Sequence, residues 1–455
     1  MVIFNNRPKL ALISLTFLAL ITGCTPQAEP PQNSSSPPLP NSSAPQTPQP
    51  EPPKAPPKPL LVSPDNPDPT TNAKIQQYIN NLAAQGFAAT DQGVWMQSGT
   101  TLLANHQGTV PLSAASVTKI ATTIAVLQTF SPEHQFSTVI SATGPIQNGQ
   151  LNGDLVIQGG EDPFFVWEEA IALGNVLNQI GIKKITGNLI ITGKFYMNYE
   201  LDPEASGNLL KLGLNSNIWP EEAETQYLAL PPDTPRPQIE IQGAVQVIPA
   251  PPANLQPLVR HYSKPLGELV KLMNMYSNNM MADMLANAVG GPQIVAQKAA
   301  QAAEVSPQEI QLINGSGLGE ENRISPRAAC GMFLALERYL QPYNMTIADV
   351  VAIVGQDLGV LESRNIPKFS IIKTGSLDRV STLAGVIPTQ NQGNICMAIM
   401  NIGGELDGFR NQQDNLLQGL LTQWGSVASP PPEVSPTAWK NGKNSKSEII
   451  KPSGT

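Results

Sequence analysis

The segment Ser116-Val117-Thr118-Lys119 opens an apolar stretch that runs to Phe130 and stops at Ser131-Pro132. An apolar run of this length, ended by a proline, predicts a buried helix that begins near Ser116. Side chains three residues apart on a helix are neighbours, so we expect the hydroxyl of Ser116 beside the amine of Lys119. A lysine near a helix N-terminus and a second cation loses its proton near neutral pH, which makes Lys119 a candidate base.

The same spacing recurs at Ser370-Ile371-Ile372-Lys373, so the pattern alone is a weak signal. The residues around this second match favour a strand, in which side chains three positions apart point to opposite faces of the sheet. Ser370 and Lys373 therefore cannot cooperate, and secondary structure selects Ser116 as the candidate nucleophile.

A second motif, Lys373-Thr374-Gly375, occurs once in the chain, at the end of a β-rich run. A strand that simply ends in a turn is the plainer interpretation. The functional interpretation is that a cation on an edge strand holds a substrate carboxylate, while the glycine lets a peptide backbone approach closely. The next residue, Ser376, is placed to offer its backbone N–H to an oxyanion.

The third motif is Ser277-Asn278-Asn279, and the same S-x-N pattern also occurs at residues 206–208 and 363–365. Apolar residues keep helical spacing on both sides of Ser277, over residues 266–276 and 281–288, and Gly290-Gly291 ends the second run. We therefore expect Ser277 at the junction of two helices, where its hydroxyl relays a proton to a leaving amine.

The remaining folded part predicts an α+β fold: an antiparallel sheet flanked by helices, with a helical subdomain and an inserted α/β domain. The predicted elements are a hairpin over residues 94–104, strands and one helix within 135–247, a β-meander over 369–402 and a last helix over 416–424. We accordingly expect a catalytic domain made of residues 71–134 and 248–428, interrupted by an inserted domain at 135–247.

The N-terminus carries Arg7 and Lys9, then an apolar run over residues 10–21, then Thr22-Gly23-Cys24. The run is too short to span a bilayer, and the whole segment resembles a bacterial lipoprotein signal. We expect residues 1–23 to be removed and Cys24 to carry a lipid anchor, with an ordinary signal peptide and an incidental cysteine as the alternative. Either interpretation predicts an exported, periplasmic protein.

Two segments have compositions too poor in apolar residues to fold. Residues 24–70 are rich in Pro and Ser and predict a disordered tether, and residues 429–455 predict a disordered tail. The formal net charge of −8 gives no electrostatic footprint for nucleic acid. Three cysteines without CxxC spacing and three distant histidines leave few zinc ligands, so we expect no metal and no cofactor. Cys330 and Cys396 either pair or stay buried and free.

The motifs SVTK, SNN and KTG, in this order, resemble the serine penicillin-recognising enzymes and, more narrowly, the peptidase S13 family of penicillin-binding protein 4 type. Further segments that carry the resemblance lie at residues 112–116, 159–163, 187–189, 263–266, 315–318, 322–326 and 383–385. The resemblance spans about residues 77–424. The chain departs from the family pattern in two respects. Asn314 stands where the family usually has an aspartate before the glycine-rich segment, and the insertion between Lys119 and Ser277 is shorter than in the large members.

This resemblance implies a β-lactamase/transpeptidase-like fold and a serine-type D-Ala-D-Ala carboxypeptidase or endopeptidase that acts on peptidoglycan stem peptides and is inhibited by penicillin. It implies roles for the motif residues as follows: Ser116 as nucleophile, Lys119 as base, Ser277 and Asn279 as proton relay and substrate amide contact, Lys373 and Thr374 as carboxylate binders, and the backbone N–H groups of Ser116 and Ser376, flanking Gly375, as oxyanion donors. Two alternatives remain open: a non-catalytic penicillin-binding, wall-tethering lipoprotein, and a β-lactamase, for which no dedicated deacylation base is evident.

Overall fold

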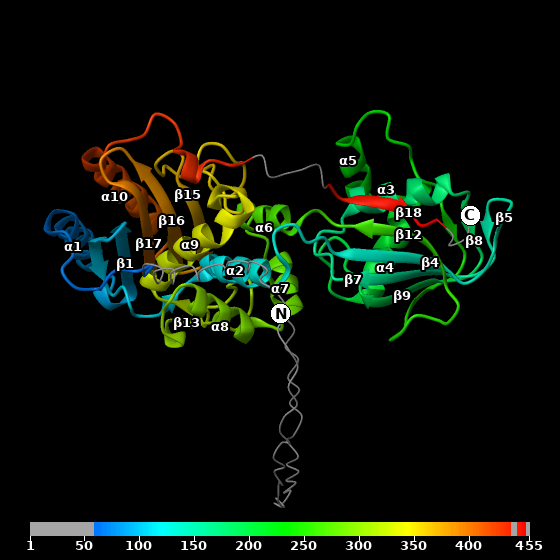
Figure 1. Cartoon of the computed structure of the whole chain (residues 1–455), viewed down its shortest axis with the longest axis horizontal. Helices are drawn as coiled ribbons and strands as arrows, with labels where there is room; N and C mark the ends of the chain where they lie inside the picture. The colour runs from blue at the N-terminus through cyan, green and yellow to red at the C-terminus, as the bar shows by residue number, and fades with distance from the viewer. Residues whose placement is uncertain (1–58, 438–443, 452–455) are drawn as a thin grey trace, which may run out of the picture. The chain divides into compact units, whose positions relative to one another are not determined.

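The computed structural model describes residues 59–437 and 444–451 (Figure 1). The predicted signal, the lipidation candidate Cys24 and most of the predicted tether lie outside these described residues. Within the described residues, no helix is long and apolar enough to cross a bilayer.

The central element is a five-stranded antiparallel sheet with the strand order β15-β16-β17-β1-β2. Its strands are β15 (Ile371–Leu377), β16 (Val380–Thr389), β17 (Gly393–Ile402), β1 (Gln92–Ser98) and β2 (Thr101–His106). Each strand pairs antiparallel with its neighbours, which confirms both the predicted meander and the predicted N-terminal hairpin. Short connections between strands produce this arrangement because only antiparallel neighbours can be joined by tight turns.

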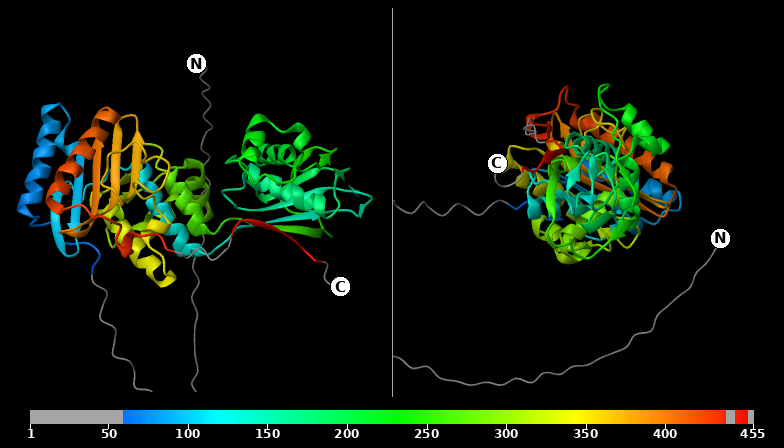
Figure 2. Two further views of the ribbon diagram at one scale, coloured as in Figure 1. Left: turned by 90° about the horizontal axis from the view of Figure 1, so that it is seen from above. Right: turned by 90° about the vertical axis from the view of Figure 1, so that its right-hand side faces the viewer.

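Helices cover both faces of this sheet. On one face lie α1 (Pro69–Ala84) and α10 (Leu406–Trp424), which share an apolar cluster with alternate residues of the strands (Figure 2). The last helix begins ten residues earlier than predicted, since its first half carries polar residues on the exposed face and buries Phe409 on the other.

The opposite face packs against α2 (Thr118–Phe130) and α9 (Pro326–Leu340). The helical subdomain also contains α6 (Leu266–Met275), α7 (Asn279–Ala288) and α8 (Pro292–Ala302). Ten consecutive residues of α2, from Thr118 to Leu127, are buried. A helical stretch enclosed by other elements has no face that solvent reaches, so its polar residues, Lys119 and three threonines, are buried together with its apolar ones.

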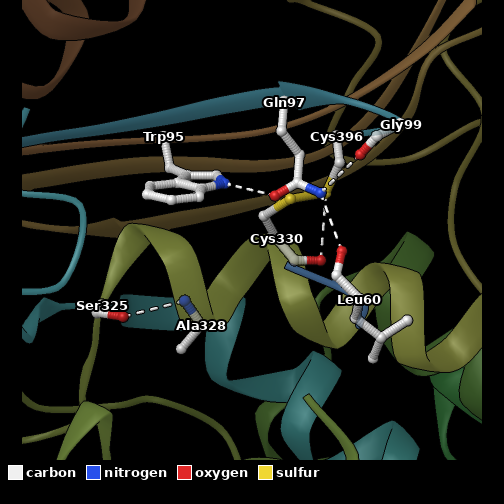
Figure 3. The surroundings of a disulfide bond; sticks show 8 residues. All are labelled: Leu60, Trp95, Gln97, Gly99, Ser325, Ala328, Cys330 and Cys396. Atoms are coloured by element: carbon white, nitrogen blue, oxygen red, sulfur yellow. Dashed lines mark hydrogen bonds between the residues drawn. A yellow bond between two sulfur atoms is a disulfide. The ribbon is translucent and has the colours of Figure 1, made fainter. Parts of the chain in front are cut away.

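A disulfide joins Cys330 on α9 to Cys396 on β17, with 5.6 Å between the Cα atoms (Figure 3). Of the two alternatives for these cysteines, the structure shows the paired one. The bond ties the helical subdomain to the central sheet across 66 residues of sequence.

The folded part begins before residue 71, so the predicted tether boundary at residue 70 is wrong. Leu60, Leu61 and Val62 pack against the core, and the backbone carbonyl of Leu60 accepts a hydrogen bond from Gln97 (Figure 3). The apolar triplet was hidden within a proline-rich composition. Asp68 then caps α1 by accepting a hydrogen bond from the backbone N–H of Thr71 at 2.7 Å.

The chain between α2 and α6, together with β18 near the C-terminus, builds a second sheet with the strand order β11-β9-β7-β4-β12-β18. Its strands are β4 (Ser137–Ala142), β7 (Leu155–Gly160), β9 (Leu189–Lys194), β11 (Val245–Val247), β12 (Gln256–Tyr262) and β18 (Lys446–Ile449). A separate apolar cluster unites this sheet with α3 (Trp167–Gln179) and α4 (Pro203–Gly213). The smaller elements of the chain are β3 (Leu112–Ser113), β5 (Ile146–Gln147), β6 (Gln150–Leu151), β8 (Lys184–Ile185), β10 (Glu240–Ile241), β13 (Ile310–Gln311), β14 (Arg323–Ile324) and α5 (Glu221–Leu228).

Two predicted boundaries change in this region. The inserted segment extends beyond residue 247, because β12 pairs antiparallel with β4. The tail from 429 to 455 is not disordered throughout, since β18 pairs antiparallel with β12 and completes the edge of the sheet. Backbone pairing with an existing edge orders a segment whose side chains are mostly polar.

Candidate active site

Ser116 lies in a 3-10 turn, η2 (Ala115–Val117), that leads directly into α2. The residue before it, Ala115, has φ +43°, a left-handed conformation that is costly for a residue with a side chain and is typical of functional sites. Lys119, in the first turn of α2, places its Nζ atom 2.9 Å from Oγ of Ser116. The predicted proximity of these two groups is therefore present.

The amine of Lys119 is completely enclosed by protein. Besides Ser116, it contacts Oδ1 of Asn279 and the carbonyl oxygen of Ser316, each at 2.7 Å. Burial lowers the pKa of Lys119 to about 7, and the charge of Asp283 opposes that change only in part. A neutral amine keeps two N–H donors, for Asn279 and Ser316, and leaves its lone pair for the Ser116 hydroxyl.

Ser277 occupies the junction of α6 and α7 with φ +54°, a second strained position in the same site. Its Oγ accepts a hydrogen bond from Nζ of Lys373 at 3.0 Å. The same Nζ donates to the backbone carbonyl of Thr374 at 2.7 Å. Burial, followed by repulsion from Lys119, lowers the pKa of Lys373 well below its ordinary value. Lys373 therefore lies behind Ser277, with its amine directed at that hydroxyl.

Gly375 allows strand β15 to lie directly against the nucleophile. A Cβ atom at this position would lie 2.8 Å from the backbone nitrogen of Ser116 and 2.2 Å from Oγ1 of Thr382. The Thr382 hydroxyl also donates to the carbonyl of Ala114 at 2.8 Å, which fastens the turn before Ser116 to the sheet. The structural reason for glycine in the third motif is this close approach.

The three motifs converge on one pocket of about 270 Å³. Its lining residues are Ser116, Ser277, Asn279, Val360, Arg364, Thr374, Ser376 and Arg410. A larger cavity of about 850 Å³ lies along residues 354–369 and the end of α10, but none of the motif residues lines it. The small pocket is lined by Ser116 and Ser277, the hydroxyls that are hydrogen-bonded to the two buried amines, and is therefore the candidate active site.

The glycine-rich segment after Asn314 supports Lys119, and sequence reasoning missed the residue that holds it. Asp283 on α7 accepts hydrogen bonds from the backbone of Gly315 at 3.0 Å and from the hydroxyl of Ser316 at 3.2 Å. Asn314 accepts from the backbone of Gly317 at 2.8 Å. Asp283 stands four positions after Asn279, on the same helix face, and that spacing was the available signal.

The competing matches to the short motifs lie elsewhere. The hydroxyl of Ser370 is buried and donates to the carbonyl of Pro367 at 2.7 Å, so it does not serve Lys373. Ser206 lies on α4, beside the second sheet, and its hydroxyl donates to the carbonyl of Glu200. Secondary-structure context therefore selected the S-x-x-K and S-x-N matches whose serines line the pocket.

The site contains two serine–lysine pairs and an edge strand that carries a glycine. It lies between an antiparallel sheet and a helical subdomain, and this arrangement defines a penicillin-recognising fold. Comparison with known proteins gives the narrower class. The profile of the D-Ala-D-Ala carboxypeptidase 3 (S13) family matches residues 74–211 and 235–422, and the chain belongs to this family.

Individual relatives are distant. The D-alanyl-D-alanine carboxypeptidase DacB of Haemophilus influenzae is 23% identical, over 68% of this chain and 84% of the relative. The crystal structure of penicillin-binding protein 4 (dacB) from H. influenzae is similar with a TM-score of 0.58 at 19% identity, covering 77% of this chain and 99% of that one. The penicillin G-acylated Bd3459 predatory endopeptidase of Bdellovibrio bacteriovorus is similar with a TM-score of 0.61 at 21% identity, covering 74% and 94%. These likenesses support the predicted fold.

Proposed function

We propose that this protein is a serine-type D-Ala-D-Ala carboxypeptidase that hydrolyses peptidoglycan stem peptides through an acyl-enzyme and is inhibited by penicillin. The observation that carries the proposal is the amine of Lys119, buried with a pKa of about 7 and 2.9 Å from Ser116 Oγ. An amine tuned to the working pH and in contact with a hydroxyl is what a nucleophilic serine requires.

In the acylation step, Ser116 Oγ attacks the carbonyl carbon between the two D-alanines while its proton passes to Lys119 Nζ. The C–N bond then breaks, and the leaving amine takes a proton through the hydroxyl of Ser277. That proton is the one that Lys119 took from Ser116, so Lys119 is neutral again before deacylation, while the hydrogen bond from Lys373 holds the Ser277 hydroxyl in place. The backbone N–H groups of Ser116 and Ser376 stabilise the oxyanion, because fixed donors cost no reorganisation when the charge develops.

In the deacylation step, water attacks the ester carbonyl and Lys119 again accepts a proton, after which Ser116 Oγ leaves with a proton and the shortened peptide is released. Asn279 and Thr374 line the pocket beside Ser116, where they contact the peptide amide and the carboxylate of the substrate. Each of these proposed roles agrees with the position of the residue in the site.

The same site accepts a cross-link as well as a terminal residue, because both bonds are D-alanyl amides. Similarity to proteins described as predatory endopeptidases supports an endopeptidase activity beside the carboxypeptidase activity. We also propose that the protein is exported to the periplasm and anchored by a lipid on Cys24, with the proline-rich segment as the tether to the wall.

The test is D-alanine release from diacetyl-L-Lys-D-Ala-D-Ala by the full-length protein and by its Ser116→Ala variant. The proposal expects release by the wild type and none by the variant at equal thermal stability. Release that survives in Ser116→Ala would refute the nucleophile, and a folded wild type that releases nothing from this peptide or from a cross-linked dimer would refute the peptidase.

A further inference from the structure

Two arginines line the active-site pocket, and one of them is already neutralised. The guanidinium of Arg364 is 5% exposed and pairs with the carboxylate of Asp414 at 2.7 Å. It also donates to Oε1 of Gln413 at 3.0 Å. A cation paired in this way with a buried carboxylate has a structural role, because breaking the pair would leave the Asp414 charge buried and unmatched.

The second arginine, Arg410, is differently placed. It projects from α10, about one third of its side chain is exposed, and its Nη2 atom donates to Oγ of Ser376 at 3.0 Å. Its acidic neighbour is Asp407, at 3.2 Å and 75% exposed. Such an exposed pair contributes little, so the guanidinium retains most of its capacity to bind an anion in the pocket.

The lysine of the third motif is less suited to that task. Lys373 is 1% exposed and does not line the pocket, and its Nζ is engaged by Ser277 and by the Thr374 carbonyl. Its pKa is lowered by burial and by Lys119. Among the residues that line the pocket, Arg410 is therefore the cation that a substrate carboxylate can reach.

We propose that Arg410 binds the carboxylate of the leaving D-amino acid, together with the hydroxyls of Ser376 and Thr374, and so makes the site selective for a free carboxylate. This inference rests on the proposed function. A guanidinium presents two parallel N–H donors that match a carboxylate, and such charge-assisted pairs are the strong ones. The same contact receives the carboxylate of a penicillin.

The experiment compares diacetyl-L-Lys-D-Ala-D-Ala with its C-terminal amide as substrates of the full-length wild type and of Arg410→Gln. Removing one charged partner should lower kcat/KM for the acid about ten- to hundredfold and leave kcat/KM for the amide nearly unchanged. Arg410→Lys keeps the positive charge but lacks the two parallel N–H donors, so it should restore part of the preference for the acid over the amide. Arg379→Gln is the matched control, because Arg379 contacts the carbonyl of Gly403 and does not line the pocket.

An equal loss for acid and amide, or no loss for either in Arg410→Gln at unchanged thermal stability, would overturn the inference. If the wild type releases nothing from either peptide, the proposed function fails separately, and acylation by benzylpenicillin and by its methyl ester replaces the peptides. If Arg410→Gln is acylated more slowly than the wild type by the free acid but not by the methyl ester, the role of Arg410 is supported. An equal effect of the substitution on the two acylation rates, or no acylation of the wild type, would overturn it.

Discussion

The Nζ atom of Lys119 lies 2.7 Å from Oδ1 of Asn279, which follows it by 160 residues in the chain. The two residues belong to different helices, α2 and α7, that pack against each other in the helical subdomain. The proton affinity of the candidate base therefore depends on tertiary packing as well as on its spacing from Ser116.

The first prediction concerns pH. Because the pKa of Lys119 lies at about 7 and only the neutral amine accepts the Ser116 proton, activity should be low below pH 6. We expect kcat/KM for peptide hydrolysis to rise with pH through a midpoint near 7 and then level off. Circular dichroism over the same pH range separates this effect from unfolding, and a rate that falls as pH rises from 6 to 8 would contradict the assignment.

The second prediction concerns Asn279. In Asn279→Asp a carboxylate replaces the amide oxygen beside the amine, and an opposite charge at this distance favours the ammonium form by about one to three pKa units. The midpoint of penicillin acylation against pH should move upward accordingly. Asn278→Asp is the control, because that residue caps α7 and aspartate caps a helix equally well. An unchanged midpoint in Asn279→Asp would show that Lys119 is not the titrating base.

The third prediction concerns the close approach at Gly375. In Gly375→Ala the new methyl group collides with Thr382 and with the backbone of Ser116, which moves the nucleophile. A misplacement of this size should lower kcat/KM about hundredfold. Gly419→Ala on α10 is the control, since nothing lies within 4 Å of its Cβ position and alanine favours a helix. Equal activities of the two variants would contradict this role of the glycine.

The fourth prediction concerns the disulfide between Cys330 and Cys396. A cross-link over 66 residues restricts the unfolded chain, so its loss should lower the free energy of unfolding by about 2–4 kcal/mol. Urea unfolding of the wild type with and without a reducing agent, beside the Cys330→Ala/Cys396→Ala variant, measures this difference. The reducing agent should affect the wild type alone, and a wild type insensitive to it would argue against the bond.

The fifth prediction concerns the C-terminal strand. Removing residues 445–455 deletes β18 and exposes the backbone edge of β12, whose amides should then exchange with solvent faster. Hydrogen–deuterium exchange of residues 256–262 measures this loss. A truncation after Lys451 retains the strand and serves as the control. Equal exchange rates in the two truncations would show that β18 does not protect the edge.

The local parts of the site could be predicted from sequence. The S-x-x-K spacing, the junction of two amphipathic helices at Ser277 and the β-meander with Lys373 are each encoded within a few residues. Their periodicities of 3.6 and 2 distinguish helix from strand. The choice of Ser116 over Ser370 needed only this distinction.

The non-local parts could not be predicted in the same way. Arg410 reaches the pocket because α10 packs beside the end of β15, and no pattern near Arg410 records that contact. The strand at residues 446–449 is polar and short, and it is ordered by the edge of β12, almost two hundred residues earlier. Composition alone therefore indicated disorder where backbone pairing imposes structure.

The central claim is that Ser116 is the residue that becomes acylated. Incubating the full-length protein with benzylpenicillin, followed by intact mass measurement and peptide mapping, tests it directly. We expect one added penicilloyl group on the peptide that contains Ser116 and none in Ser116→Ala. Acylation of the folded Ser116→Ala variant to the same extent, or a modification mapped to Ser277 or Ser370, would contradict it.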